Sequence, residues 1–173
     1  NANTTGADNA SFGYAALDAN TTGSHNVAIG SAALGTNTTA DENTAVGSLS
    51  LFTNTTGAAN TAVGHDSLRL NTTGASNSAF GVDALRANTT GTQNVALGSL
   101  SLSSNTVGQY NVGLGYRALA TNVDGSRSTA IGHAALAAHD PASAIDTYNT
   151  AVGFHAGNAV TTGVQNTFIG GLA

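Results

Sequence analysis

Cysteine, methionine, tryptophan and lysine are absent from this chain of 173 residues, and proline occurs once. Without cysteine, neither a disulfide scaffold nor a thiolate metal site can form. Four arginines and a net charge of −5 leave no basic patch, so nucleic acid is not an expected partner. No run approaches the roughly 20 apolar residues of a membrane span, so we expect no membrane insertion by this segment.

What the chain has instead is a repeat of 17 residues, Asn-x-Ala-Φ-Gly-x-x-Ala-Leu-x-x-Asn-Thr-Thr-Gly-x-x, where Φ is large and apolar. The first residue of each unit, the leading asparagine, is replaced once, by Ser128, and a four-residue insertion within 139–148 then delays the register until Asn149. The glycine after Φ, the corner glycine, is present in all ten units: Gly13, Gly30, Gly47, Gly64, Gly81, Gly98, Gly115, Gly132, Gly153 and Gly170. A fixed period of this length predicts a single solenoid domain over residues 1–173, in which each unit is one coil.

Two apolar positions recur along the coils and are predicted to form the core, with like residues stacked about 4.8 Å apart. The first, the large-residue ladder, comprises Phe12, Ile29, Val46, Val63, Phe80, Leu97, Leu114, Ile131, Val152 and Ile169. The second, the leucine ladder, comprises Leu17, Leu34, Leu51, Leu68, Leu85, Leu102, Leu119 and Leu136. Two ladders per coil favour an all-β parallel solenoid flattened into two sheets, rather than a triangular helix with an apolar residue every six positions.

The residue before the large-residue ladder is small in nine of the ten coils, and strand alternation places it on the opposite face. An outward strip of small residues would let another sheet approach closely. We therefore predict an oligomer interface, most simply of a homotrimer, along an alanine strip of Ala28, Ala45, Ala62, Ala79, Ala96, Ala130 and Ala151.

The units Asn26–Gly30, Asn43–Gly47, Asn60–Gly64 and Asn149–Gly153 resemble the Asn-Ser-Val-Ala-Ile-Gly repeats of YadA-like trimeric autotransporter adhesin heads. That resemblance implies a left-handed, trimeric β-roll on an extracellular adhesin, although the family's usual repeat is shorter than 17 residues. The longer unit is also similar to β-roll repeats of phage and viral tail fibres. The two resemblances imply an extracellular, cell-surface or virion-surface location.

No catalytic, cofactor or metal site is predicted. The nine acidic residues and five histidines are scattered over several coil positions, and no pair of carboxylates recurs as an acid–base dyad. Asp66 and Arg69 repeat as Asp83 and Arg86 one coil later, which is typical of a surface charge ladder. The chain is therefore not expected to be an enzyme.

The insertion is the one break in the repeat, and loops that project from a rigid scaffold often carry function. It supplies a candidate binding loop formed by His139, Asp140, Asp146 and Tyr148. A host surface glycan or a protein receptor is the expected kind of ligand.

Two functions follow from these patterns. The first is a structural and adhesive protein, a rigid extracellular fibre or adhesin head that mediates surface attachment. The alternative is an ice-binding solenoid that uses threonine ladders, for which the pairs from Thr4–Thr5 to Thr89–Thr90 provide a row.

Overall fold

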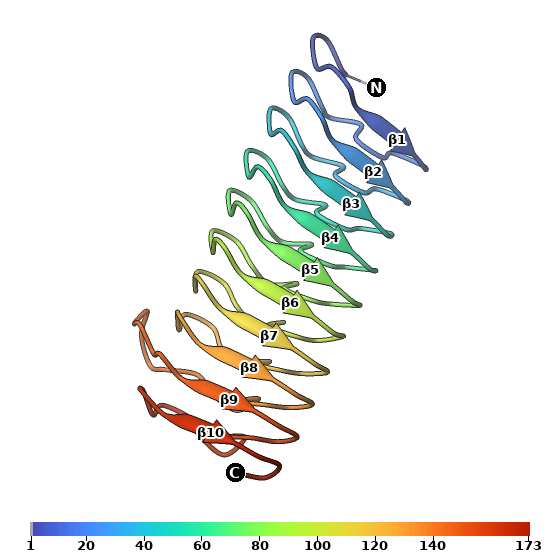
Figure 1. Ribbon diagram of the computed structural model, residues 1–173. Helices are drawn as coiled ribbons and strands as arrows, with labels where there is room; N and C mark the ends of the chain where they lie inside the picture. The colour runs from blue at the N-terminus through green and yellow to red at the C-terminus, as the bar shows by residue number, and fades with distance from the viewer. Residues whose placement is uncertain (1) are drawn as a thin grey trace.

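The computed structural model describes residues 2–173, and they form a parallel β-solenoid of about nine turns, each of about 17 residues, without a helix (Figure 1). Ten three-residue strands lie side by side in chain order in one parallel sheet. The strands are β1 (Ala10–Phe12), β2 (Val27–Ile29), β3 (Thr44–Val46), β4 (Thr61–Val63), β5 (Ser78–Phe80), β6 (Val95–Leu97), β7 (Val112–Leu114), β8 (Thr129–Ile131), β9 (Thr150–Val152) and β10 (Thr167–Ile169). Like repeat positions pair throughout, as in Ala45 beside Ala62.

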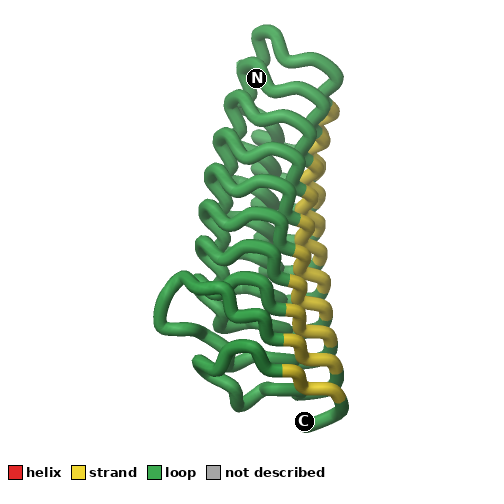
Figure 2. Tube along the Cα trace, turned by 60° about the vertical axis from the view of Figure 1, so that its left-hand side comes forward, coloured by secondary structure: helices red, strands yellow, loops and turns green. Residues whose placement is uncertain are grey.

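The expected second sheet is wrong for residues 2–173, because every strand there belongs to the one sheet. The strands line a single wall of the stack, and turns build the remaining walls (Figure 2). The turns are nevertheless bonded from coil to coil; Leu51 N, for example, donates to Ser67 O at 3.0 Å. Alternation of left-handed and right-handed backbone along this wall prevents the extended conformation of a strand.

The two faces of the strands are the reverse of those expected. Ala28, Ala45, Ala62, Ala79, Ala96, Ala130 and Ala151 are fully buried, so the predicted alanine strip is part of the core and cannot be an oligomer interface. The large-residue ladder faces outward: Ile29, Phe80, Leu97 and Leu114 are each about two-fifths exposed or more. Its assignment to the core was therefore also wrong.

The leucine ladder lies in the core, with Leu34 to Leu136 fully buried against the alanine strip. The interior of each typical coil is filled by one leucine, the strand alanine and the small residue that precedes the leucine, such as Ala33 or Ser67. Alanine suits the facing position because a larger side chain there would overfill the interior. The large residue of each strand is consequently left on the outside.

Leucine is also selected by backbone conformation. Leu34, Leu51, Leu68 and their equivalents have φ of 49 to 54°, in the left-handed region. Within residues 2–173, all 28 non-glycine residues with positive φ lack a β-branch, because valine, isoleucine and threonine are strained in this conformation.

The corner glycines are selected by backbone conformation and by lack of space. At Gly64, φ is +135°, and a Cβ would lie 2.5 Å from the carbonyl oxygen of Gly81 in the next coil. Both the backbone conformation and the close approach of successive coils therefore exclude a side chain.

Two buried asparagine ladders join the coils. In the ladder of leading asparagines, Asn43 N donates to Asn26 Oδ1 at 3.0 Å, and Asn43 Nδ2 donates to Gly57 O at 2.9 Å. In the ladder of turn asparagines, the first residues of the Asn-Thr-Thr turns, Asn71 Nδ2 donates to Asn54 Oδ1 at 2.8 Å and to Gly74 O at 2.9 Å. These bonds satisfy amides that would otherwise be costly to bury.

Candidate functional site

The insertion widens the loop between β8 and β9 and projects beyond the outline of the neighbouring coils (Figure 2). Residues 142–146 are exposed, whereas Pro141 beneath them is buried. The loop rejoins the stack where Asp146 forms a parallel bridge with Ser126.

The four residues of the predicted binding loop do not form one site. His139 is fully buried and takes the next place in the ladder of turn asparagines, after Asn122. Its Nε2 lies 3.3 Å from Asn149 Nδ2, while its Nδ1 and the Oδ1 of Asn122 have no hydrogen-bond partner. Burial lowers the pKa of His139, which favours the neutral ring.

Asp140 is also structural, because its Oδ1 accepts a hydrogen bond of 3.0 Å from the backbone nitrogen of Val123 in the preceding coil. His139 and Asp140 occupy the places in the stack that the first two residues of the Asn-Thr-Thr turn take in earlier coils. Both positions therefore support the loop rather than a ligand.

Asp146 and Tyr148 do lie together, and they form a cluster with Arg127 and Tyr110 at the corner before the strands. Arg127 Nε lies 2.9 Å from Asp146 Oδ2, and Tyr148 Oη donates to the same oxygen at 3.2 Å. The Arg127 guanidinium carbon is 4.7 Å from the ring centre of Tyr110 and 5.9 Å from that of Tyr148. The hydrogen bond and the charge of Asp146 raise the pKa of Arg127, which stays cationic.

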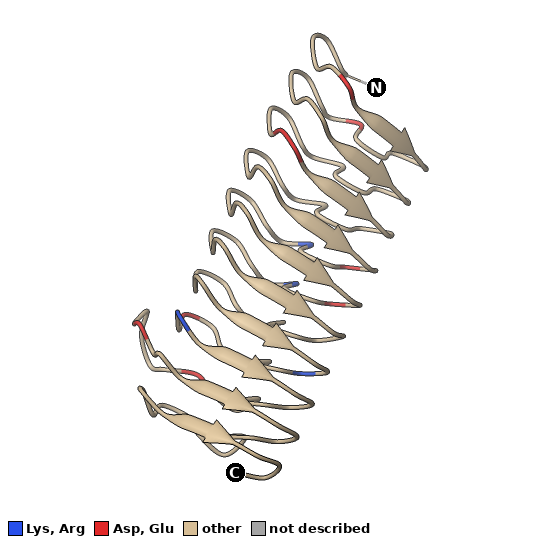
Figure 3. Cartoon of the chain, in the orientation of Figure 1, with Lys and Arg blue, Asp and Glu red and all other residues tan. Residues whose placement is uncertain are grey.

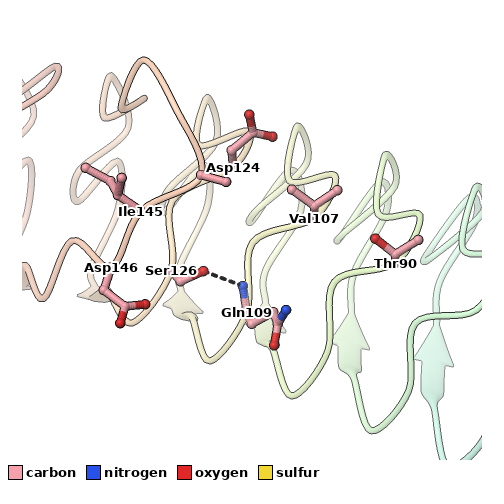
Figure 4. A pocket seen from close by; sticks show the side chains of 8 residues that line it. Thr90, Val107, Gln109, Asp124, Ser126, Ile145 and Asp146 are labelled. Carbon is pink, nitrogen blue, oxygen red and sulfur yellow. Dashed lines mark hydrogen bonds between the residues drawn. The ribbon is translucent and has the colours of Figure 1, made fainter.

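Beside this cluster lies an open recess with a volume of about 530 Å³. Its walls are two ridges that run along the stack, one with Thr90, Val107 and Asp124 and the other with Gln109, Ser126 and Asp146 (Figure 4). The insertion closes one end. The lining residues are Thr90, Val107, Asp124, Gln109, Ser126, Ala144, Ile145 and Asp146. A volume of this size is in the range of small-molecule sites.

Sequence reasoning missed most of these lining residues, although a signal was present. The second threonine of the Asn-Thr-Thr turn, conserved in the coils from Thr5 to Thr90, is replaced by Val107 and then by Asp124. The leading asparagine is also lost nearby, at Ser128, whose hydroxyl lies 2.5 Å from that of Thr147. Departures from the repeat therefore gather in the coils that line the recess and in the coil that carries the insertion.

The other candidate groups lie apart from this recess. Arg69 is 3.5 Å from Asp66 and Arg86 is 3.5 Å from Asp83, each pair within its own coil. Within residues 2–173, no group of three or more His, Cys, Asp or Glu is placed to hold a metal ion. The same residues include no helix long and apolar enough to cross a membrane.

A second aromatic cluster lies past the corner glycines of β7 to β9. The ring of His133 lies 5.2 Å from those of Tyr116, Phe154 and His155. The rings stack on one another along the axis, so each ring face is largely covered by a neighbouring ring.

The fold defines the chain as a repeat protein of the parallel β-solenoid class. No family model, curated protein or solved structure was found to match it.

Proposed function

We propose that the chain is a non-enzymatic structural and adhesive protein, a rigid segment of an extracellular fibre or adhesin head that acts on a cell or virion surface as a homotrimer. The observation that carries the proposal is the outer face of the sheet. Its two outward positions in every strand hold no charged residue (Figure 3). An uncharged face with a ladder of large apolar residues along its whole length is typical of a protein interaction surface.

The outer face consists of the large-residue ladder and a column of Val, Thr, Ser and Ala that begins each strand. Phe80, Val95, Leu97 and Leu114 expose a large share of their side chains, although the core is complete without them. Burial against further copies of the chain would therefore add stability that the monomer lacks, at roughly 25 cal/mol per Å².

The outer face reaches the area of a stable interface only together with residues along its borders. Ten strands at about 4.8 Å spacing and about 10 Å of strand length cover about 450 Å². Stable interfaces bury about 800 Å² per partner. Exposed corner residues such as Tyr116 and Phe154, two positions beyond the ladder, are placed to supply part of the remainder.

Stiffness supports the mechanical part of the proposal. Backbone bonds, asparagine ladders and threonine hydroxyls join every coil to the next; Thr72 Oγ1, for example, donates to Thr89 O at 3.0 Å. A rod bound together in this way holds repeated weak binding sites at fixed spacing, so that their contributions combine through effective concentration.

The test is the solution mass by light scattering over a dilution series. We expect a trimer that persists on dilution, and a double variant Phe80→Lys/Leu97→Lys that is monomeric with an unchanged circular dichroism spectrum. Thr56→Lys, an exposed position away from the sheet, is the matched control and should remain trimeric. A monomeric wild type would overturn the proposal, and a dimer would overturn its threefold symmetry.

Ice binding is the second candidate, favoured by one observation. The second threonine of each Asn-Thr-Thr turn is exposed, which sets Thr5, Thr22, Thr39, Thr56, Thr73 and Thr90 in a row at coil spacing. The first threonine contributes its hydroxyl to the next coil, so the exposed row is one residue wide. Thermal hysteresis in a monomeric sample, lost in Thr56→Lys, would favour this candidate over the fibre.

A further inference from the structure

We propose that the recess beside the insertion binds a short segment of a neutral oligosaccharide. The inference rests on the proposed adhesive function and names the ligand class of that attachment. It is carried by the composition of the recess, by the cluster at its rim and by the departures from the repeat that line the recess.

The recess combines acceptors for hydroxyl groups with apolar surface. Asp124 and Asp146 line it from opposite ridges, and Gln109 lies on the same ridge as Asp146, beyond Ser126 (Figure 4). Val107 and Ile145 line the same space. A sugar presents the matching surfaces, because its ring carries hydroxyl donors at the edge and C–H groups on the faces. Ligand sites in general pair apolar walls with a few placed polar groups of this kind.

The charge of the lining selects against acidic sugars. The recess contains two carboxylates, and Arg127 is paired with one of them at 2.9 Å. Asp124 has no cation within ion-pair distance among the described residues, and its Oδ1 accepts only a hydroxyl bond of 3.0 Å from Thr106. An anionic ligand would therefore meet uncompensated negative charge, whereas neutral hydroxyls would meet acceptors.

The rim is organised before a ligand arrives. Asp146 holds Arg127 against the ring of Tyr110 and accepts the hydroxyl of Tyr148. Both tyrosines remain about half exposed, so ring surface stays available beside the recess. Preorganised side chains lose less conformational entropy on binding, which matters for a ligand that is held weakly.

The site lies where the sequence departs from the repeat. In the coils before it, the ridge position is threonine, and the corner position carries residues such as Ser76 and Gln93. Val107 and Asp124 replace the threonine only in coils that line the recess, and Tyr110 and Arg127 occupy the variable corner position of the same coils. Structural repetition alone does not explain the two changes at the ridge.

The experiment is a titration of the full chain, labelled with ¹⁵N, with cellotetraose, maltotetraose and chitotetraose, and with tetragalacturonate as the anionic probe. We expect at least one neutral probe to shift the amide signals of Gln109, Ser126 and Ile145 at millimolar concentration, and tetragalacturonate to shift none. Asp124→Thr restores the residue of the repeat and should weaken binding about tenfold, because it removes a charged acceptor. Thr73→Val, on the same ridge two coils from Val107, should bind as the wild type does.

Two results would overturn the inference: no shift at the recess with any neutral probe, or equal affinity in the wild type and Asp124→Thr. The mass of each sample separates this failure from that of the proposed function. A trimer without sugar binding removes the ligand assignment alone, and a monomer that binds sugar removes the proposed assembly alone.

Discussion

The ring of Phe168 in β10 fills the space that a side chain at position 157 would take. A Cβ at Gly157 would lie 2.8 Å from Cδ2 of Phe168 and 3.0 Å from Cδ2 of Leu136. Position 157 is where the leucine ladder would continue, and position 168 is where the strand alanine would stand. The last two coils therefore exchange a large and a small residue across the core and preserve its volume.

This exchange predicts a coupled pair. Gly157→Leu should lower the free energy of unfolding by about 1–3 kcal/mol through overpacking, although φ of 61° at this position suits leucine as it does in the other coils. Phe168→Ala should lower it by up to about 3 kcal/mol through a cavity. The double variant restores the residues of the repeat and should be more stable than either single variant in urea unfolding. Additive losses in this double-mutant cycle would show that the two positions are not coupled.

His139→Asn should stabilise the protein. Asparagine at this position would extend the ladder of turn asparagines and supply the donor that Asn122 Oδ1 lacks. Asn149 would lose its contact with the ring but keep its 2.7 Å hydrogen bond to Gly163 O. We expect a gain of about 1 kcal/mol in urea unfolding, and a loss in the control His139→Ala. A loss in His139→Asn as well would show that the ring itself is required.

Stability should fall in mild acid because of the same histidine. Its pKa in the folded state is lowered by burial, whereas in the unfolded chain it is about 6.5. Between these values the unfolded state binds more protons, so the stability from this group is complete above about pH 6.5 and declines as pH falls through the folded-state pKa. Urea midpoints measured from pH 7.5 to 5 should show this slope in the wild type. His139→Asn should reduce it, and an unchanged slope would assign it to other groups.

Leu68→Val should cost more than the loss of one methylene. Leu68 has φ of 51°, where a β-branched residue is strained, so we expect a loss of about 2–3 kcal/mol. The matched control is Leu97→Val, the same change in the extended backbone of β6, where valine stands at the equivalent place in β3 and β4. The control should change stability by less than about 1 kcal/mol when both variants are measured in a Phe80→Lys background whose monomeric mass is first verified by light scattering. Equal losses at the two positions would refute the backbone argument.

Part of the site was predictable and part was not. The insertion was visible as a break in the period, and Asp146 and Tyr148 do lie near each other at its end. The burial of His139 was not predicted, because only the stack shows that it stands in line with Asn122. The recess was missed for the same reason, since Thr90, Val107 and Asp124 are separated by a full coil in sequence and become neighbours only in the stack.

The sequence by itself determined the solenoid, its period and the two alternating sets of strand residues, because a fixed repeat with glycine corners has no other regular way to bury its apolar residues. It also placed the leucine ladder inside. Which strand face turns inward was decided only by the tertiary structure. Alternation places Ala45 and Val46 on opposite faces of the strand but does not say which face is buried. Hydrophobicity alone would bury Val46, whereas the structure buries Ala45. The deciding factor is packing: one leucine, the strand alanine and the small residue before the leucine already fill the interior of a coil, and alternation along the sequence does not state how much space a coil encloses.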